Sequence, residues 1–268
     1  MTAEPHAPTR IRPAEGESYS DTVRRLAAAQ KSGKGAPAYS RFVNRKLGRL
    51  FAAAGFHLGM TPNGITVVSA AFSFAGIILL ATVQPSWWLG ILITLLLVLG
   101  YALDAADGQL ARLRGGGSVT GEWLDHMVDC LKISTLHMCV LISWYRFGVM
   151  VSDGMDERWL LVPIGYAIVA AVSFFAQILN EQLTKNAALK RGTATSATAP
   201  PGETPSVLVS LLKIPTDYGL LCLIFVLLGA SDLFIAAYTL MFIGSAAYLA
   251  AASIKWFGQM KDLDRGGS

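Results

Sequence analysis

Four aspartates stand in stretches of sequence that are otherwise apolar. Asp104 and Asp107 follow 42 consecutive residues, 62–103, that include no Asp, Glu, Lys, Arg or His. Asp125 and Asp129 belong to the next apolar stretch. Residues three or four apart share one face of a helix, so each pair would point in a single direction. An ionised aspartate costs several kcal/mol in hydrocarbon, so these side chains must be paired, hydrated or bound to a cation.

The chemistry of such a cluster has two interpretations. Four converging carboxylates cannot all stay ionised without cations. One or two divalent cations would balance them, because Mg²⁺ and Mn²⁺ prefer carboxylate oxygen. Two metals bridged by carboxylates are typical of phosphate chemistry. Buried carboxylates are also typical of a proton or sodium site in a transporter, so the cluster alone leaves both classes open.

The elements that must position these aspartates are membrane helices. Of the 268 residues, 53% are apolar and 15% are charged, whereas a soluble domain has about a quarter of its residues charged. The composition excludes intrinsic disorder, a collagen-like fibre and a disulfide scaffold. About 20 apolar residues span a bilayer as a helix. We therefore predict an all-α integral membrane fold with six transmembrane helices, over residues 63–83, 87–112, 119–147, 159–183, within 207–229, and 232–256.

Residues 39–60, ahead of the first span, predict an amphipathic juxtamembrane helix. Its apolar positions recur at helical intervals, and four basic residues lie between them: Arg41, Arg45, Lys46 and Arg49. Such a helix suits the interface of an anionic leaflet, although a helix that packs on its own protein has the same pattern. Residues 1–38 predict a flexible polar tail, residues 61–256 the transmembrane catalytic domain, and residues 257–268 a second tail.

The basic residues predict the orientation. Eighteen of the 22 Lys and Arg residues precede the first span or follow the second, fourth and sixth. Only Arg146 and Arg158 fall in the opposite loops. The positive-inside rule then places both termini, both tails and the active site on the cytoplasmic side of the plasma membrane.

The aspartates belong to a longer motif. The sequence resembles the signature of the CDP-alcohol phosphotransferase (CDP-alcohol phosphatidyltransferase) family, D-x2-D-G-x2-A-R-x8-G-x3-D-x3-D, with every spacing intact. The eight specified positions are Asp104, Asp107, Gly108, Ala111, Arg112, Gly121, Asp125 and Asp129. The resemblance covers roughly residues 39–256 and agrees with six membrane helices and cytoplasmic termini.

The resemblance implies the chemistry and the role of each residue. Family members cleave a CDP-linked donor, transfer a substituted phosphate group to an alcohol and release CMP. Two divalent cations, Mg²⁺ or Mn²⁺, would be held by Asp104, Asp107, Asp125 and Asp129. Asp129 would also be the general base that takes the proton of the acceptor. The donor nucleotide would be bound by Asp107, Gly108, Ala111, Arg112, Gly121, Ser118 and Asn63.

The motif does not fix the direction of transfer. We favour CDP-diacylglycerol as the donor and a small water-soluble alcohol as the acceptor. The alternatives are another CDP-alcohol that donates its head group to a lipid alcohol, an ion-coupled transporter, and a scaffold that has lost activity. The resemblance also implies a homodimer in the lipid bilayer, and nothing in the sequence calls for a nucleic-acid partner.

Two lysines inside predicted spans are candidates for acceptor binding. Lys132 lies three residues after Asp129, and a buried lysine needs an anionic partner or ligand. Lys213 lies four residues before Asp217, with which it would pair. These cations suit an acceptor that carries a phosphate, such as inositol phosphate or glycerol phosphate, although basic residues near cytoplasmic helix ends also obey the positive-inside rule.

Overall fold

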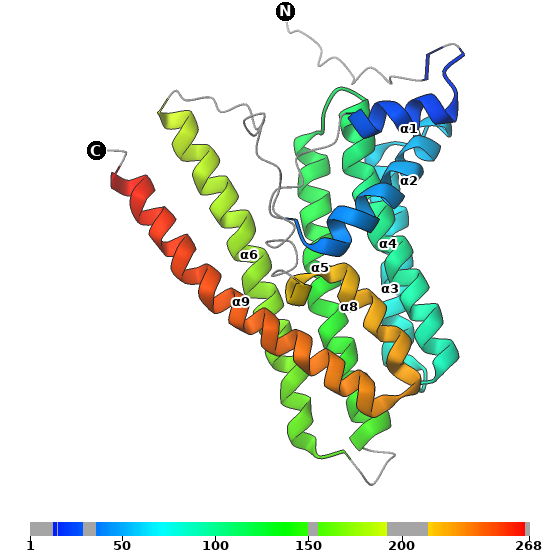
Figure 1. Cartoon of the computed structure of the whole chain (residues 1–268), viewed down its shortest axis with the longest axis vertical. Helices are drawn as coiled ribbons and strands as arrows, with labels where there is room; N and C mark the ends of the chain where they lie inside the picture. Colours follow the sequence, from blue (N-terminus) through cyan, green and yellow to red (C-terminus); the bar gives the residue numbers. More distant parts are fainter. Residues whose placement is uncertain (1–12, 15, 29–35, 150–154, 192–213, 266–268) are drawn as a thin grey trace, which may run out of the picture.

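The computed structural model of the chain describes residues 13–14, 16–28, 36–149, 155–191 and 214–265. All regular elements in these ranges are helical (Figure 1). Five helices are long and apolar enough to cross a membrane. They are α3 (Pro62–Thr82), α4 (Trp87–Leu113), α5 (Val119–Ser143), α6 (Leu161–Lys190) and α9 (Ser231–Arg265). The all-α membrane fold predicted from the sequence is therefore confirmed.

The count of six spans stays a prediction. The fifth predicted span corresponds to α8 (Tyr218–Ile224), which continues as the 3-10 helix η5 (Phe225–Gly229). Together these elements form a shorter apolar helix. The start of the predicted span, residues 207–213, lies outside the described residues.

Hydroxyl side chains define where the first three spans begin. Thr61 Oγ1 accepts the Gly64 N–H at 3.1 Å, at the start of α3. Ser86 Oγ accepts the Leu89 N–H at 3.2 Å, at the start of α4. Ser118 does the same for α5. Each cap satisfies a backbone donor that the helix itself leaves unpaired. The predicted starts agree with these caps to within a residue or two.

Close packing of small residues joins α3 to α4. Ser69 Oγ donates a hydrogen bond to the Gly100 carbonyl at 2.8 Å, and both Ser69 and Ser73 are buried. A Cβ atom at Gly100 would collide with the Ser73 hydroxyl. Small residues allow two membrane helices to approach this closely. The helix that bears Asp104 and Asp107 is therefore held rigidly along α3.

Helix α2 (Arg45–His57), preceded by the π-helix η1 (Ser40–Asn44), occupies most of the predicted juxtamembrane segment. Its buried face, which includes Ala53 and Phe56, packs against Leu110 of α4. Its other side leaves Leu50 and Leu58 exposed. The helix thus packs on its own protein as well as carrying an exposed apolar edge, and its location at the bilayer interface stays a prediction.

The sequence analysis did not anticipate α1 (Tyr19–Ala28), which lies inside the polar segment 1–38. The Ser18 hydroxyl donates to the Asp21 carboxylate at 2.6 Å, and Asp21 N–H donates back to Ser18 Oγ. This reciprocal cap lowers the pKa of Asp21. Leu26 is buried against α2, and the Tyr19 hydroxyl donates to the Leu50 carbonyl at 3.0 Å. Packing on α2 therefore orders a helix that composition alone did not indicate.

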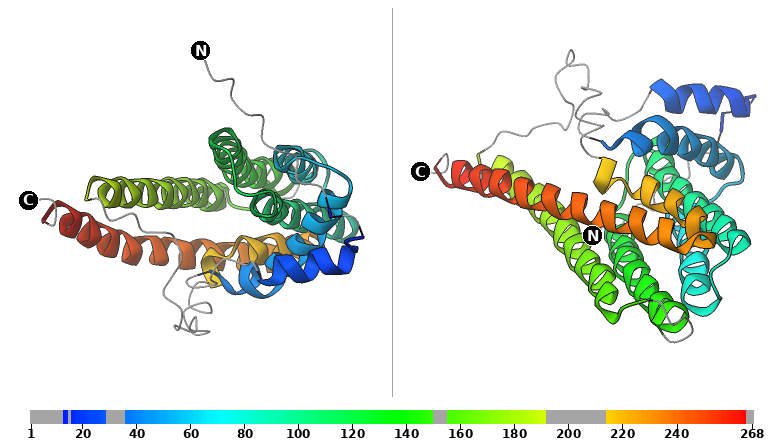
Figure 2. Two further views of the ribbon diagram at one scale, coloured as in Figure 1. Left: turned by 90° about the horizontal axis from the view of Figure 1, so that it is seen from above. Right: turned by 60° about the horizontal axis from the view of Figure 1, so that its bottom comes forward.

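Helices α6 and α9 lie side by side and extend away from the other helices (Figure 2). In their most apolar windows, 17% of residues are buried in the span of α6 and 22% in α9, against 44% in both α3 and α4. Much of the surface of α6 and α9 is therefore apolar and exposed, as expected for helices that face lipid.

Candidate active site

The turn between α4 and α5 brings the two aspartate pairs to the same end of the molecule. Gly115 and Gly116 have φ values of 94° and 136°, in the left-handed region that favours glycine. They reverse the chain directly after Arg114, the residue that ends α4. The conformational freedom of these glycines therefore allows a short connection between the two helices that carry the acidic residues.

Three of the four motif carboxylates converge. Asp104, Asp125 and Asp129 each offer an oxygen atom, and these oxygens lie within 4.8 Å of one another. All three residues are half-buried. Hard divalent cations prefer carboxylate oxygens that lie this close together, so the donor set fits Mg²⁺ or Mn²⁺.

Lys132 lies directly against this cluster. Its ammonium Nζ is 2.5 Å from Asp104 Oδ1 and 2.8 Å from Asp129 Oδ1, and the residue is 4% exposed. The anionic partner that the sequence predicted for Lys132 is thus a pair of motif carboxylates. Three carboxylates and one ammonium group leave two negative charges uncompensated, which matches the charge of one divalent cation.

The fourth carboxylate, Asp107, lies apart from the group of three. It is 7% exposed, and its Oδ2 accepts a 2.5 Å hydrogen bond from the Thr66 hydroxyl of α3. It remains within electrostatic reach of Asp104 and Asp125. The sequence did not assign this contact to Thr66, although a hydroxyl one turn into an apolar helix is a signal that such a bond is available.

Three of the residues predicted to bind nucleotide, Asn63, Ser118 and Gly121, meet at the start of α5. A Cβ atom at Gly121 would lie 3.0 Å from Asn63 Oδ1 and 3.1 Å from Ser118 Oγ. Gly121 therefore permits close approach of α5 to α3. Gly108, on α4, has open space beside it, with Arg112 Nη1 at 3.6 Å from the position of a Cβ atom. Ala111 is largely buried.

Helix α8 begins near the cluster, since Tyr218, its first residue, lies within electrostatic reach of Asp104 and Asp129. Asp217 caps α8 by accepting the Gly219 N–H at 3.1 Å, and it also accepts the Tyr39 N–H at 2.6 Å. The lysine predicted to pair with it, Lys213, lies outside the described residues. A carboxylate directly before a helix start is a common capping signal, and this signal was available in the sequence.

The histidines in the described residues take structural positions. His137 Nδ1 lies 2.6 Å from the buried Tyr238 hydroxyl, and His57 Nε2 lies 3.0 Å from Thr22 Oγ1. His126 contacts Glu122 at 4.0 Å. None of these three histidines belongs to the group of residues that could hold a cation, which consists of Asp104, Asp125 and Asp129.

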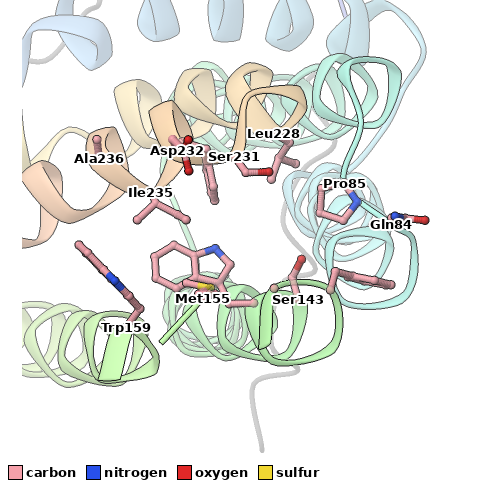
Figure 3. A pocket seen from close by; sticks show the side chains of 14 residues that line it. Gln84, Pro85, Ser143, Met155, Trp159, Leu228, Ser231, Asp232, Ile235 and Ala236 are labelled. Carbon is pink, nitrogen blue, oxygen red and sulfur yellow. The ribbon is translucent and has the colours of Figure 1, made fainter. Parts of the chain in front are cut away.

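A separate cavity of about 550 Å³ lies at the opposite end of the helices (Figure 3). Its lining includes Ser143, Trp144, Trp159 and Asp232. It adjoins Pro85, two residues before α4 begins, whereas Asp104 follows 17 residues into that helix. At 1.5 Å per residue this separation is roughly 25 Å. The cavity is therefore not part of the carboxylate site.

Apolar helices of spanning length and a half-buried acidic cluster together define a membrane protein with a candidate cation site. The sequence model of the CDP-alcohol phosphatidyltransferase family matches residues 59–254. The chain belongs to this family, and its apolar helices make it a multi-pass membrane protein.

The chain is similar to curated proteins of two kinds, a phosphatidylinositol phosphate synthase and cholinephosphotransferases. The chain is 30% identical over 104 residues to the phosphatidylinositol phosphate synthase of Mycolicibacterium smegmatis, over 39% of this chain and 45% of that protein. It is 34% identical over 109 residues to cholinephosphotransferase 1 of Bos taurus, over 38% of this chain and 25% of that protein. The matches thus span less than half the length of these relatives.

Proposed function

We propose that this protein transfers a phosphatidyl group from CDP-diacylglycerol to the hydroxyl group of a small alcohol and releases CMP. The observation that carries the proposal is the convergence of Asp104, Asp125 and Asp129 within 4.8 Å on an intact family motif. A phosphorylated polyol is the proposed acceptor, and the resemblance to a phosphatidylinositol phosphate synthase supports this choice.

Asp104, Asp125 and Asp129 would hold divalent cations, and Asp107 would contribute an oxygen ligand to a second cation. Bound cations neutralise the negative charge that develops on the phosphate oxygens during transfer. Thr66 supports this arrangement, because its hydrogen bond fixes the orientation of the Asp107 carboxylate. We propose Mg²⁺ or Mn²⁺ on the basis of the all-oxygen donor set.

Asp129 acts as the general base in this proposal. The acceptor oxygen forms a bond to the phosphorus that carries diacylglycerol, and the bond from that phosphorus to the CMP oxygen breaks. CMP leaves with the electron pair of that bond, and the acceptor proton passes to Asp129. Lys132 contacts Asp129 Oδ1 at 2.8 Å and therefore holds the carboxylate in one orientation.

The donor nucleotide binds at the turn between α4 and α5. Arg112 contacts the diphosphate with its fork of N–H donors, and Gly108 leaves room beside it. Asn63 and Ser118, which meet at Gly121, contact the cytidine part. These assignments place the donor on the α3 side of the cluster and leave the α8 side for the acceptor.

Lys132 and Lys213 stay proposed acceptor contacts. Lys132 already forms ion pairs with Asp104 and Asp129. It would therefore bind the acceptor phosphate only if that phosphate lies directly beside these two carboxylates. We further propose a homodimer with both termini and the active site on the cytoplasmic side of the plasma membrane. The distribution of Lys and Arg supports this orientation.

The test is CMP release by the purified protein in detergent. CDP-diacylglycerol and Mg²⁺ or Mn²⁺ are supplied with inositol phosphate, glycerol phosphate, inositol or serine. We expect acceptor-dependent CMP that is lost by at least a thousandfold in Asp129→Asn, a change that keeps the shape of the side chain. CMP release that continues in this variant would contradict the role of Asp129.

A second direction of transfer is favoured by one observation, the similarity to cholinephosphotransferase 1. In this case a CDP-alcohol donates its head group to diacylglycerol. The same assay, run with CDP-choline and diacylglycerol, separates the two directions. If product forms only with CDP-choline and diacylglycerol, the donor is a CDP-alcohol and not CDP-diacylglycerol.

A further inference from the structure

The hydroxyl group of Tyr218 is buried at the active-site end of α8. The atom is inaccessible to solvent and has no nitrogen or oxygen hydrogen-bond partner among the residues that the structure describes. The polar group near it is the Cys222 thiol, one turn further along α8, and a thiol is a weak hydrogen-bonding group. A buried hydroxyl without a strong partner is costly in free energy, so this atom calls for a functional explanation.

Tyr218 lies beside the carboxylates. Its ring packs edge-on against Tyr101, with ring centroids 5.1 Å apart. Tyr101 is one helical turn before Asp104 on α4, and Tyr218 lies within electrostatic reach of both Asp104 and Asp129. The phenol therefore lies near the cluster, next to the turn of α4 that carries Asp104.

The position of Tyr218 is fixed by its neighbours along the chain. Asp217 ties the N-terminus of α8 to the backbone of Tyr39. Gly219 lies directly under the Tyr39 ring, where any larger residue would collide with it. The Tyr39 ring in turn stacks on Tyr101, with centroids 6.3 Å apart. The phenol is thus held in place by contacts that leave its hydroxyl group unused.

We propose that the Tyr218 hydroxyl donates a hydrogen bond to an oxygen atom of the acceptor alcohol, next to the hydroxyl that attacks. This inference rests on the proposed function. The attacking oxygen gives its proton to Asp129 and its lone pair to phosphorus. A hydrogen bond that positions the acceptor is therefore better made to a second oxygen atom of the acceptor. The acceptor must then carry at least two oxygens, which describes a polyol or its phosphate and excludes a simple amino alcohol with one hydroxyl group.

The charge of the site agrees with this assignment. The ammonium group of Lys132 is already bound to both Asp104 and Asp129, so its N–H donors are largely taken up by those carboxylates. A neutral phenol donates to a neutral hydroxyl oxygen there without adding a charge that must be compensated. The donor diphosphate, by contrast, requires cations, and Arg112 lies on the other side of the cluster.

The test compares Tyr218→Phe with Tyr101→Phe in the CMP-release assay. The acceptor is whichever compound of inositol phosphate, glycerol phosphate, inositol and serine the unaltered protein uses best. We expect Tyr218→Phe to raise the KM for a polyol acceptor about ten- to hundredfold, the usual effect of removing one partner of a buried hydrogen bond. The KM for CDP-diacylglycerol and the melting temperature should not change.

Tyr101→Phe is the matched control. It removes a hydroxyl group that hydrogen-bonds with Ser40, and it leaves the ring contact with Tyr218 in place. It should leave both KM values unchanged. A general loosening of the aromatic group would alter both variants alike and would overturn the proposal.

Three other outcomes also overturn it. An unchanged acceptor KM in Tyr218→Phe shows that the hydroxyl group does not contact the acceptor. An increase in the KM for CDP-diacylglycerol assigns the contact to the donor. A preference of the unaltered protein for ethanolamine, supplied as an additional acceptor with a single oxygen atom, removes the polyol argument. If the unaltered protein releases no CMP with any acceptor, the proposed function itself has failed, and this result is distinct from a failure in the variant alone.

Discussion

The helices fall into a tightly packed group, α2 to α5, and a more exposed pair, α6 and α9. The most apolar windows of α3 and α4 are 44% buried, whereas those of α6 and α9 are 17% and 22% buried. All four motif aspartates and Lys132 belong to the packed group. The difference teaches that the charged chemistry is built where neighbouring helices fix each side chain, because catalytic groups must be held to within a fraction of an ångström.

The exposed pair has a different role. Its surface is formed by large apolar side chains, such as Phe175 and Ile243, which are 65% and 57% exposed. Near the end of α6, Lys185 pairs with Glu181 at 2.7 Å and with Glu122 of α5 at 3.9 Å. These ion pairs are solvent-exposed, whereas those of Lys132 are buried. Matched substitutions in the two regions therefore test whether burial decides their effects.

The largest expected effect is that of Lys132→Met. Removing one partner of a buried ion pair leaves uncompensated charge and costs about 3–5 kcal/mol. The thermal midpoint in detergent with EDTA should fall strongly, and Mn²⁺ should restore part of the loss by supplying positive charge to Asp104 and Asp129. Lys185→Met, in an exposed pair worth about 0–1 kcal/mol, should change the midpoint little. Equal midpoints for the two variants would contradict the comparison.

The next effect concerns cation binding by the carboxylates. Asp125→Asn removes one charged oxygen ligand and should weaken Mn²⁺ binding by about ten- to hundredfold, measured by electron paramagnetic resonance. The control is Asp232→Asn, in the first turn of α9 and at the opposite end of the molecule. It should bind Mn²⁺ as the unaltered protein does. Equal losses in the two variants would mean that the cations bind outside the cluster.

The smallest effect concerns packing at glycine. Gly100→Ala places a methyl group against the Ser73 hydroxyl and should cost about 1–3 kcal/mol of stability. Gly258→Ala, in α9, meets open space and should be neutral or slightly stabilising, since alanine favours a helix. Thermal midpoints in the same detergent check both. A tolerated Gly100→Ala would show that α3 and α4 are less closely packed than their contacts indicate.

Much of the fold was predictable because its signals are local. Long apolar stretches predict α3, α4, α5, α6 and α9, since a membrane helix satisfies its own backbone hydrogen bonds. The hydroxyl caps at Thr61, Ser86 and Ser118 mark three of the starts. Helix α1 was not predictable in this way, because packing of Leu26 against α2 stabilises it while its own composition is polar.

The sequence predicted which residues form the site better than it predicted how they are arranged. The motif spacing names the four aspartates, and the resemblance it carries names their family. The spacing does not reveal that Asp107 bonds with Thr66 while the other three converge. Nor does it show that Asp217 also accepts a hydrogen bond from the backbone of Tyr39, which is 178 residues away in sequence.

The sequence by itself determined the class of fold, the membrane helices, the acidic motif and the family, because these follow from local composition and fixed spacing. Only the tertiary structure decided which carboxylates lie together, that Lys132 compensates two of them, and that Tyr218 of α8 packs against Tyr101 beside the same cluster. These contacts join residues from separate helices. They depend on how the helices pack around buried charge. The periodicity of one helical segment does not determine how that segment packs against the others.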